Sequence, residues 1–415
     1  MASLKFWDAI PSFHLDFLLL RQLADYKKLV SRINLKLACQ TQGMKKIIVS
    51  VINDLVSDQR VHRSCQTLHE MGFEVILVGR HKSNSLRLTP RDYKTHQMRL
   101  LFEKGPFFYA EYNLRLFILL LFRSADVLFS NDLDTLLPNF IIHKLKRIPI
   151  VFDSHEYFTE TPELADRKNV KRIWKSIERF IMPKLTEIIT VNSSIALLFE
   201  KEYGIKVAVI RNVPMNHKTS FHLSKKELGL PENQKIILIQ GSGLNIDRGL
   251  EELTEAMVFV DNAILVILGD GDVIPLIKQK VNTLNLHEKI KFIPKQSLEK
   301  LQLFTRHADL GISIDKNTNL NYQLSLPNKI FDYIHAGIPV LCSPLVEIKS
   351  IIDKYEIGEY IGNHDPKHIA DRINSILKDE AILKKYKANT LKASKELNWE
   401  NEKSQLIRIF DKYAG

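Results

Sequence analysis

The chain has 415 residues, 45% of them hydrophobic and 26% charged, with a formal net charge of +11 and a pI near 9.3. This length is too great for one ordinary hydrophobic core and suits two domains of about 150–200 residues each. The composition excludes disordered and coiled-coil proteins. The positive charge favours an anionic partner, but the basic residues are dispersed and no nucleic-acid recognition motif accompanies them, so we expect no nucleic-acid partner.

The composition also predicts a cytoplasmic protein. The three cysteines, Cys39, Cys65 and Cys342, are far apart in the sequence and form no metal-binding or redox pair, which is typical of reduced cysteines. No segment reaches the roughly 20 uninterrupted apolar residues of a membrane-spanning helix. The N-terminus lacks the pattern of a secretory signal, so we expect no export.

Residues 1–43 show helical periodicity without a strand and are predicted to form a helical extension. From residue 44 to 214, short β-branched runs alternate with longer amphipathic stretches, which predicts parallel strands joined by crossover helices. The predicted elements of this first domain are strand 45–52, helix 60–71, strand 73–79, helix 114–122, strand 126–132, helix 136–144, strand 149–156, helix 171–185, strand 187–192, a further helix, and strand 206–214.

Residues 215–392 repeat the alternation without repeating the sequence, and predict a second α/β domain. Its predicted elements are strand 235–243, a helix from 250, strand 262–271, a helix near 275, strand 290–294, strand 308–314, helix 326–337 and strand 338–343. Two closing helices are predicted over 366–378 and 380–412. We expect the C-terminal helix within 393–415 to pack back on the first domain.

Ligands of parallel sheets bind at the carboxyl ends of the strands, so the loops that follow the strands are the candidate sites. In the loop 241–249 (GSGLNIDRG), Gly241 and Gly243 permit a close backbone approach, and Arg248 can contact a diphosphate through its planar fork of donors. Asn245 lies in the same loop. A plain turn, with Asn245 or a neighbouring aspartate capping the next helix, is the alternative.

The segment 326–329 (LPNK) predicts the start of a helix, because proline is tolerated there. Free amides at a helix start carry about half a positive charge and attract phosphate, to which Lys329 would add a full charge beside Asn328. Asp332 lies one turn further and, as an acceptor, suits a ribose or sugar hydroxyl. A helix cap with solvated charges accounts for the same residues equally well.

Two acidic segments each have two possible roles. GDGD, with Gly269 and Asp270, either borders a nucleotide or is a tight turn, and we favour the turn. The histidines and acids show no convincing metal-ligand spacing, although the isolated pair Asp132 and Asp134 leaves a small opening for a metal. We therefore predict chemistry without a metal, in which basic side chains and helix amides stabilise a departing diphosphate.

In the first domain, the strand ending in FDSHE places Asp153, His155 and Glu156 in close succession. His155 could shuttle a proton, bind a hydroxyl group or be a hydrogen-bonded core imidazole. Asn53 and Asp54 occupy the equivalent loop after the first strand. The acids of these loops either form an acceptor-side site or cap helices.

From Met44 to the C-terminus, the chain resembles the family 4 (group 1) retaining glycosyltransferases of GT-B fold, which have two facing Rossmann-like domains. The segment 326–341 (LPNKIFDYIHAGIPVL) is similar to the donor-binding helix of that family, with Asp332 at the position of its ribose-binding acid. The resemblance implies that loop 241–249 binds the donor phosphates, that GDGD and 292–295 border the base, and that His155 lies near the reacting sugar. Gly243 and Leu324 depart from the family pattern, which has a frequent arginine and the first glutamate of a pair there.

The resemblance implies transfer of a sugar from a UDP- or GDP-sugar to a hydroxyl of a glycan or lipid-linked acceptor, with retention, in cell-surface polysaccharide synthesis. The nucleotide sugar is the substrate and no cofactor is expected. His155 and Asp332 are the candidate catalytic residues. Apolar residues 107–122 and the basic arm around 27–36 would suit peripheral contact with an anionic inner membrane face. A nucleotide-sugar epimerase of the same fold and a non-catalytic nucleotide-sugar-binding protein stay open.

Overall fold

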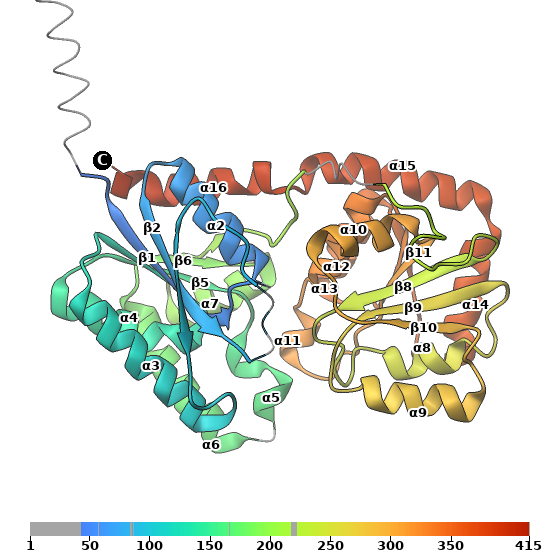
Figure 1. Cartoon of the computed structure of the whole chain (residues 1–415), viewed down its shortest axis with the longest axis horizontal. Coiled ribbons are helices and arrows are strands. Elements are labelled where there is room, and N and C mark those ends of the chain that lie inside the picture. Colours follow the sequence, from blue (N-terminus) through green and yellow to red (C-terminus); the bar gives the residue numbers. More distant parts are fainter. Residues whose placement is uncertain are drawn as a thin grey trace, which may run out of the picture. The chain divides into compact units, whose positions relative to one another are not determined.

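The computed structural model describes residues 43–56, 58–83, 85, 87–165, 167–216 and 222–414. Most of the predicted helical extension, with its basic residues, lies outside the described residues. From Lys46 onward the chain forms one unit that contains two parallel β-sheets (Figure 1). This confirms the predicted pair of Rossmann-like sheets. We call the parts around them the N-terminal and the C-terminal domain.

Within the described residues, the N-terminal sheet has seven parallel strands in the order β3-β2-β1-β4-β5-β6-β7. The strands are β1 (Lys46–Asp54), β2 (Glu74–His81), β3 (Lys94–Arg99), β4 (Val127–Asn131), β5 (Ile150–Ser154), β6 (Glu187–Thr190) and β7 (Ala208–Val209). The α-helices of this domain are α2 (Gln59–Glu70), α3 (Gly105–Phe122), α4 (Leu133–Lys146), α5 (Pro162–Ala165), α6 (Lys168–Ile181) and α7 (Ser193–Tyr203).

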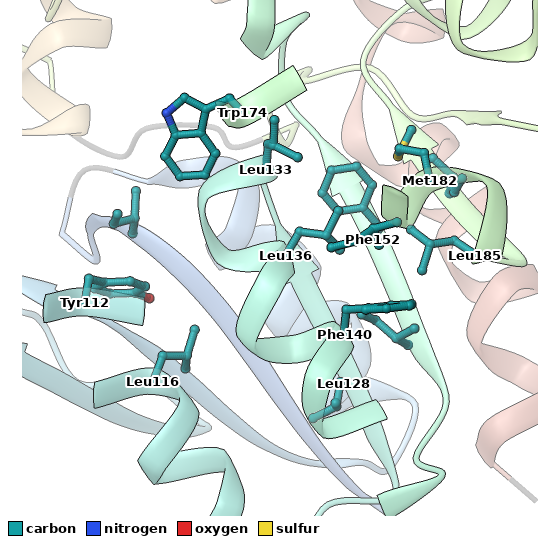
Figure 2. Packing of buried hydrophobic residues seen from close by; sticks show 14 of the residues in the cluster. Tyr112, Leu116, Leu128, Leu133, Leu136, Phe140, Phe152, Trp174, Met182 and Leu185 are labelled. Atoms are coloured by element: carbon teal, nitrogen blue, oxygen red, sulfur yellow. The ribbon is translucent and has the colours of Figure 1, made fainter. Parts of the chain in front are cut away.

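Both faces of this sheet are buried. Ile48 and Ile52 of β1 point into a cluster with α3 and α4, whereas Val49 and Val51 point into a second cluster on the other face. Figure 2 shows the first cluster, in which side chains of α3, α4 and β5 meet. A strand that is buried on both faces needs an unbroken apolar run, which is why the sequence revealed these strands.

The strand β3 was missed by the sequence analysis. Its sequence, KTHQMR, is polar, and Met98 is the one residue of the strand that is buried. It pairs with β2 alone, at the edge of the sheet. An edge strand needs no continuous apolar run, so its periodicity gives no strand signal.

The C-terminal sheet has six parallel strands among the described residues, in the order β10-β9-β8-β11-β12-β13. They are β8 (Lys235–Gly241), β9 (Ala263–Gly269), β10 (Ile290–Ile293), β11 (Leu310–Ser313), β12 (Val340–Cys342) and β13 (Gly358–Tyr360). The helices here are α8 (Leu250–Ala256), α9 (Ile274–Leu284), α10 (Leu298–His307), α11 (Leu320–Gln323), α12 (Asn328–Ala336), α13 (Val346–Tyr355), α14 (Pro366–Lys378) and α15 (Glu380–Glu396).

The last predicted helix, 380–412, is in fact two helices, α15 and α16 (Trp399–Ala414). Asn398 separates them, because its side-chain oxygen accepts a hydrogen bond from the backbone of Asn401 at 3.0 Å. The helix α16 then packs on the N-terminal domain: the indole of Trp399 donates to Thr67 at 3.1 Å, and Phe410 lies fully buried in the second cluster of that domain. The chain therefore returns to the domain in which it began (Figure 1).

Candidate active site

His155 lies between two carboxylates just after β5. Its Nδ1 is 3.0 Å from Oδ2 of Asp132, its Nε2 is 3.4 Å from Oδ2 of Asp153, and its side chain is 15% exposed. Burial alone would lower the pKa of His155, but the two carboxylates raise that pKa well above its ordinary value. The two carboxylates therefore favour the doubly protonated ring of His155. In that form both ring nitrogens donate hydrogen bonds.

Asp153 contacts His155 on one side and forms a buried ion pair with Arg60 on the other. Nε and Nη2 of Arg60 donate to its two oxygens at 2.9 and 2.7 Å, and both side chains are at most 3% exposed. Burial would raise the pKa of Asp153, but Arg60 and His155 hold that pKa below its usual range. Asp153 was expected on the acceptor side. In the structure its carboxylate lies between the guanidinium of Arg60 and the ring of His155.

Asp132 has an unusual backbone, with φ 61° and ψ 159°. This region favours glycine, and such a conformation costs about 1–3 kcal/mol in other residues. It persists here because the carboxylate of Asp132 holds both the ring of His155 and its backbone N–H, which donates to Oδ1 at 2.8 Å. Backbone strain of this kind is typical of functional sites.

Glu156 connects the His155 loop with the other domain. Nδ2 of Asn321, in α11, donates to Oε2 of Glu156 at 3.2 Å, and the backbone N–H of Tyr157 donates to Oδ1 of Asn321 at 3.2 Å. Burial and the charge of Asp132 raise the pKa of Glu156 to about 7, although Asn321 and Arg248 oppose the shift. The carboxyl group of Glu156 is therefore about half protonated at neutral pH.

The loops after β8 and β9 pack backbone against backbone. The N–H of Leu244 donates to the carbonyl of Asp270 at 3.0 Å, and the N–H of Asp270 donates to the carbonyl of Gly241 at 3.1 Å. A Cβ atom on Gly269, which has φ +136°, would lie 1.8 Å from the Gly241 oxygen. Glycine is required at 269 for this approach, which joins the two loops into one wall.

Polar side chains of these two loops form hydrogen bonds to the backbone of the loops. Oδ1 of Asn245 accepts from the backbone of Asp272 at 3.3 Å, and Oδ1 of Asp270 accepts from Gly271 at 2.9 Å. Both contacts are local to these loops. At Gly243, an added Cβ would meet nothing nearer than 3.9 Å, so the backbone there is open to a ligand.

Arg248 and Lys329 converge on the buried carboxylate of Asp315. Nη1 of Arg248 lies 2.9 Å from one oxygen of Asp315, and Nζ of Lys329 lies 3.5 Å from the other. The side chains of Asp315, Lys329 and Arg248 are 0, 9 and 24% exposed. The guanidinium also stacks 4.2 Å from the ring centre of Tyr322. Two cations on one carboxylate leave an excess positive charge, which suits a phosphate group.

Asp332 faces the end of β8. Nε2 of Gln240 donates to its Oδ2 at 2.8 Å. Burial raises the pKa of Asp332 to about 6, against the opposing effects of Arg63 in α2 and of the Gln240 hydrogen bond. Asn328, the first residue of α12, is exposed, and no hydrogen bond of its side chain to another described residue is found.

Both halves of the site face each other. Three electrostatic interactions between charged side chains cross from one domain to the other. They join Glu156 with Arg248, Arg63 with Asp332, and Lys82 with Lys295. Direct contacts join the domains as well. Nδ2 of Asn192 donates to the carbonyl of Leu324, and the N–H of Ser194 donates to Glu347, each at 2.7 Å. The carboxyl ends of the two sheets thus form one site.

Two residues expected on the acceptor side shape the loop after β1. The amide of Asn53 donates to Asp58 at 2.9 Å, and Asp58 caps α2. Asp54 accepts from the backbone of Val56 at 3.1 Å and from the hydroxyl of Ser85 at 2.6 Å. Of the acids in this loop, Asp58 caps the helix, whereas Asp54 holds the loop itself.

Sequence reasoning missed Asp315, Arg60 and Asn321. Asp315 directly follows the apolar run of β11, so the rule that located the other loops could have found it. Arg60 and Asn321 lie in helices, and their partners are far away in the sequence. Within the described part of the chain, no group of three or more histidines, cysteines or acids could hold a metal ion.

Two family models match the chain, "Glycosyl transferases group 1" over residues 220–393 and "Glycosyltransferase Family 4" over residues 58–213. Among known proteins, the chain is similar to a phosphatidyl-myo-inositol mannosyltransferase of Mycobacterium leprae, with 23% identity over 272 residues. That similarity spans 64% of this chain and 68% of the relative.

Solved structures support the fold. A sucrose-phosphate synthase of Thermosynechococcus elongatus superposes with a TM-score of 0.74 at 15% identity, over 89% of this chain and 98% of that one. Anabaena HepE in complex with UDP-glucose superposes with a TM-score of 0.66 at 14% identity, over 88% and 99% of the two chains. At such identities the likeness concerns the fold alone.

The raised pKa of Glu156 predicts a pH-dependent effect of Glu156→Gln on stability. An unfolded glutamate has a pKa of about 4.3, so the folded wild type binds its proton more tightly. The stabilisation from this proton is complete below the unfolded pKa and is lost as the pH rises through about 7. Glutamine resembles the protonated carboxyl group at every pH. We expect the variant to match the wild type at pH 4.5 and to be more stable by about 1–3 kcal/mol at pH 8.

Urea unfolding at the two pH values measures this difference. Glu288→Gln is the matched control, because Glu288 is exposed and its replacement should have the same small effect at both pH values. A stability difference between Glu156→Gln and the wild type that does not change with pH would contradict the assignment.

Proposed function

Since the chain belongs to the group 1 glycosyltransferases of family 4, which have the GT-B fold, we propose that it transfers a sugar from a UDP- or GDP-sugar to a hydroxyl group of a glycan or lipid-linked acceptor, with retention of configuration. The observation that carries this proposal is the facing arrangement of Arg248 and Lys329 on one domain and His155 on the other. It offers one place for a diphosphate and one for the reacting sugar.

The C-terminal domain would bind the donor. Arg248 and Lys329 would hold the diphosphate, and the open backbone at Gly243 would approach it. Asp332 would accept a hydrogen bond from a ribose hydroxyl. The complex of Anabaena HepE with UDP-glucose supports a nucleotide sugar as the donor, and no separate cofactor is needed.

The proposed retaining transfer has to account for the proton of the acceptor hydroxyl. The new bond joins the acceptor oxygen to the anomeric carbon, and the bond from that carbon to the diphosphate breaks on the same face. The carboxylates beside His155 favour its protonated form, so we do not assign it the role of base. The departing phosphate oxygen would take the proton of the acceptor hydroxyl. His155, as a cation, would stabilise the charge that develops on the departing group.

We place the reaction in the cytoplasm, at the inner membrane face, in cell-surface polysaccharide synthesis. The helix α3 supports this placement: one of its faces packs in the core, while Phe107, Leu114, Ile118 and Phe122 are 46–82% exposed. None of the described helices is long and apolar enough to cross a bilayer. An apolar face beside the exposed Arg123 suits a helix that lies in a membrane surface.

Product analysis tests the proposal as a whole. The protein is incubated with UDP- and GDP-sugars and bacterial lipid extract, and the products are identified by mass spectrometry and by NMR of the anomeric centre. We expect a glycosylated product whose anomeric configuration matches that of the donor. A free epimerised sugar, or binding of the donor without any product, would contradict glycosyl transfer.

Donor binding should depend on Arg248 and Asp332. Because a hydrogen bond to a charged group contributes about 1.5–3 kcal/mol, Arg248→Gln should weaken UDP or GDP binding about 10- to 100-fold. Wild-type affinity should fall as the pH drops through about 6, since Asp332 then takes up a proton. Asp332→Asn should remove this pH dependence. Isothermal calorimetry measures both effects, with exposed Lys367→Gln as the charge-matched control.

His155 should matter for transfer more than for binding. Because electrostatic stabilisation by one donor contributes about 10²–10³ in kcat, His155→Ala should lower the transfer rate by that factor. Nucleotide affinity should change less than about threefold, because Arg248 and Lys329 would hold the bound diphosphate, whereas the charge that His155 would stabilise develops only during transfer. The exposed His69→Ala is the control. Equal losses of binding and transfer would show that His155 only supports the fold.

Vesicle flotation tests the membrane contact. The protein should float with vesicles that contain anionic phospholipid, and a double variant, Phe107→Ser with Ile118→Ser, should float less, because both side chains are exposed on the same helix. If the wild type does not float at low salt, the proposed membrane contact is wrong.

A further inference from the structure

The strand β3 forms one edge of the N-terminal sheet. It pairs with β2 along its whole length, and no described strand pairs with its other side. A parallel edge strand points the N–H and C=O groups of every second residue away from its partner. The carbonyl of Arg99, the last residue of the strand, accepts from Nη1 of Arg115 at 3.1 Å. The outer side of β3 can therefore pair with another extended chain.

Two cavities flank β3, one on each face of the sheet. The first, of about 400 Å³, lies between β3 and α3, on the face where Met98 packs in the first core cluster. The second, of about 550 Å³, lies between β3 and the preceding segment 87–91, on the face where Tyr93 packs in the second cluster. Gln97 lines both cavities. Since successive side chains of a strand point to opposite faces, an added strand would direct alternate side chains toward the two cavities.

The two cavities differ in their walls. Apolar side chains contribute to the first, namely Met98 of β3 and Ile118 and Leu119 of α3. The second has polar side chains on both sides, with Arg87, Thr89 and Arg91 from the preceding segment and Thr95 and Gln97 from the strand. A strand that fits both cavities would alternate apolar and polar side chains.

The edge carries an excess of positive charge. Arg99 and Arg115 line the first cavity, Arg87 and Arg91 line the second, and no acidic residue is among the described residues that line either one. Arg115 forms an ion pair with Glu111 at 2.7 Å. Arg87 and Arg99 are exposed, and neither forms an ion pair with another described residue. The polar side chains of a strand bound here would therefore be acidic.

The same charges argue against other occupants of the edge. A second copy of β3 would bring arginines against arginines, which is unfavourable. An anionic membrane surface could neutralise the arginines, but it has no main-chain groups to pair with those of the strand. An extended acidic peptide satisfies both the charge and the backbone.

We propose that β3 is a docking edge for an extended acidic segment of another protein, which adds a strand to the N-terminal sheet. Its apolar side chains would enter the cavity beside α3, and its acidic side chains would enter the cavity beside Arg87 and Arg91. Main-chain hydrogen bonds would give affinity and the two cavities specificity. Three strands separate β3 from β5, which precedes His155, so this interaction is independent of the proposed glycosyl transfer.

Peptide binding tests the docking edge. The full chain is titrated into the fluorescein-labelled peptide EVEVEVEV, and fluorescence polarisation gives the affinity. We expect saturable binding that weakens as salt is added. The peptide EEEEVVVV has the same composition without the alternation and should bind at least about tenfold more weakly, because only alternation fills both cavities. The charge-reversed KVKVKVKV should not bind.

Methylation of the peptide backbone tests for strand addition. One version of EVEVEVEV is N-methylated at its valines and another at its glutamates. The N–H groups of one set would point at β3 and those of the other set away from it. We expect one methylated peptide to lose binding and the other to keep it. Hydrogen exchange should show that the unmethylated peptide protects amides of residues 94–99.

Two variants of the chain test the cavity beside Arg87. Arg87→Glu should weaken EVEVEVEV at least about fivefold, because it places like charges together. Thr95→Trp should also weaken it, because the indole would fill the second cavity. Both positions are exposed, so the midpoint of thermal unfolding should stay close to that of the wild type. Lys367→Glu, an equally exposed charge reversal on α14, is the control and should bind like the wild type.

Several results would overturn the docking edge. They are no binding of EVEVEVEV to the wild type, equal binding of the unmethylated and both methylated peptides, or equal losses from Lys367→Glu and Arg87→Glu. Dimerisation of the wild type that Thr95→Trp abolishes, measured by sedimentation, would assign the edge to a second copy. Protection of residues 94–99 by anionic phospholipid vesicles would assign it to a membrane.

Discussion

A single buried carboxylate organises the donor side of this protein. Asp315 has no exposed surface, and a buried charge without a partner is strongly unfavourable. The chain therefore has to bring Arg248 and Lys329 to it from two different loops. Their positions are set before any ligand arrives, so little freedom is lost when a phosphate binds. One carboxylate cannot neutralise two cations, which leaves the positive charge that a diphosphate needs.

The segment around α11 links this donor side to the opposite domain. Tyr322 stacks on the guanidinium of Arg248, and its neighbour Asn321 contacts Glu156 and the backbone of Tyr157. Leu324, which stands where the family pattern has a glutamate, is buried in the core cluster of the N-terminal domain. The departure at 324 thus has a physical reason, since this side chain packs between the domains.

The N-terminal side stores unfavourable free energy in its reacting groups. Asp132 has a strained backbone, Glu156 is a half-buried acid whose pKa is raised to about 7, and Asp134 has an oxygen without a partner among the described residues. A protein that only had to fold would avoid all three. They are tolerated because the surrounding sheet, helices and the Arg60–Asp153 ion pair hold them firmly. Such concentrated strain is what an active site with preorganised polar groups requires.

Sequence patterns alone predict the two parallel sheets and the loops of the candidate site. Apolar runs reveal strands that are buried on both faces, and parallel strands place their following loops at one edge. The sequence analysis missed the edge strands β3, which is polar, and β13, which has only three residues, because neither has such a run. It also did not show the break at Asn398 that sends α16 back to the first domain.

The contacts of each polar side chain, by contrast, depend on how the chain folds. Asp153 and His155 are two residues apart and looked alike as site residues, yet one is sealed against Arg60, 93 positions away, and the other is partly exposed. Arg248 contacts Asp315, which is 67 positions away in the sequence, and Glu156 contacts Asn321, which is 165 positions away. Local sequence patterns reflect only interactions between residues that are close in the sequence, within one turn or one strand. Charge, burial and hydrogen bonding depend on residues that only folding brings close.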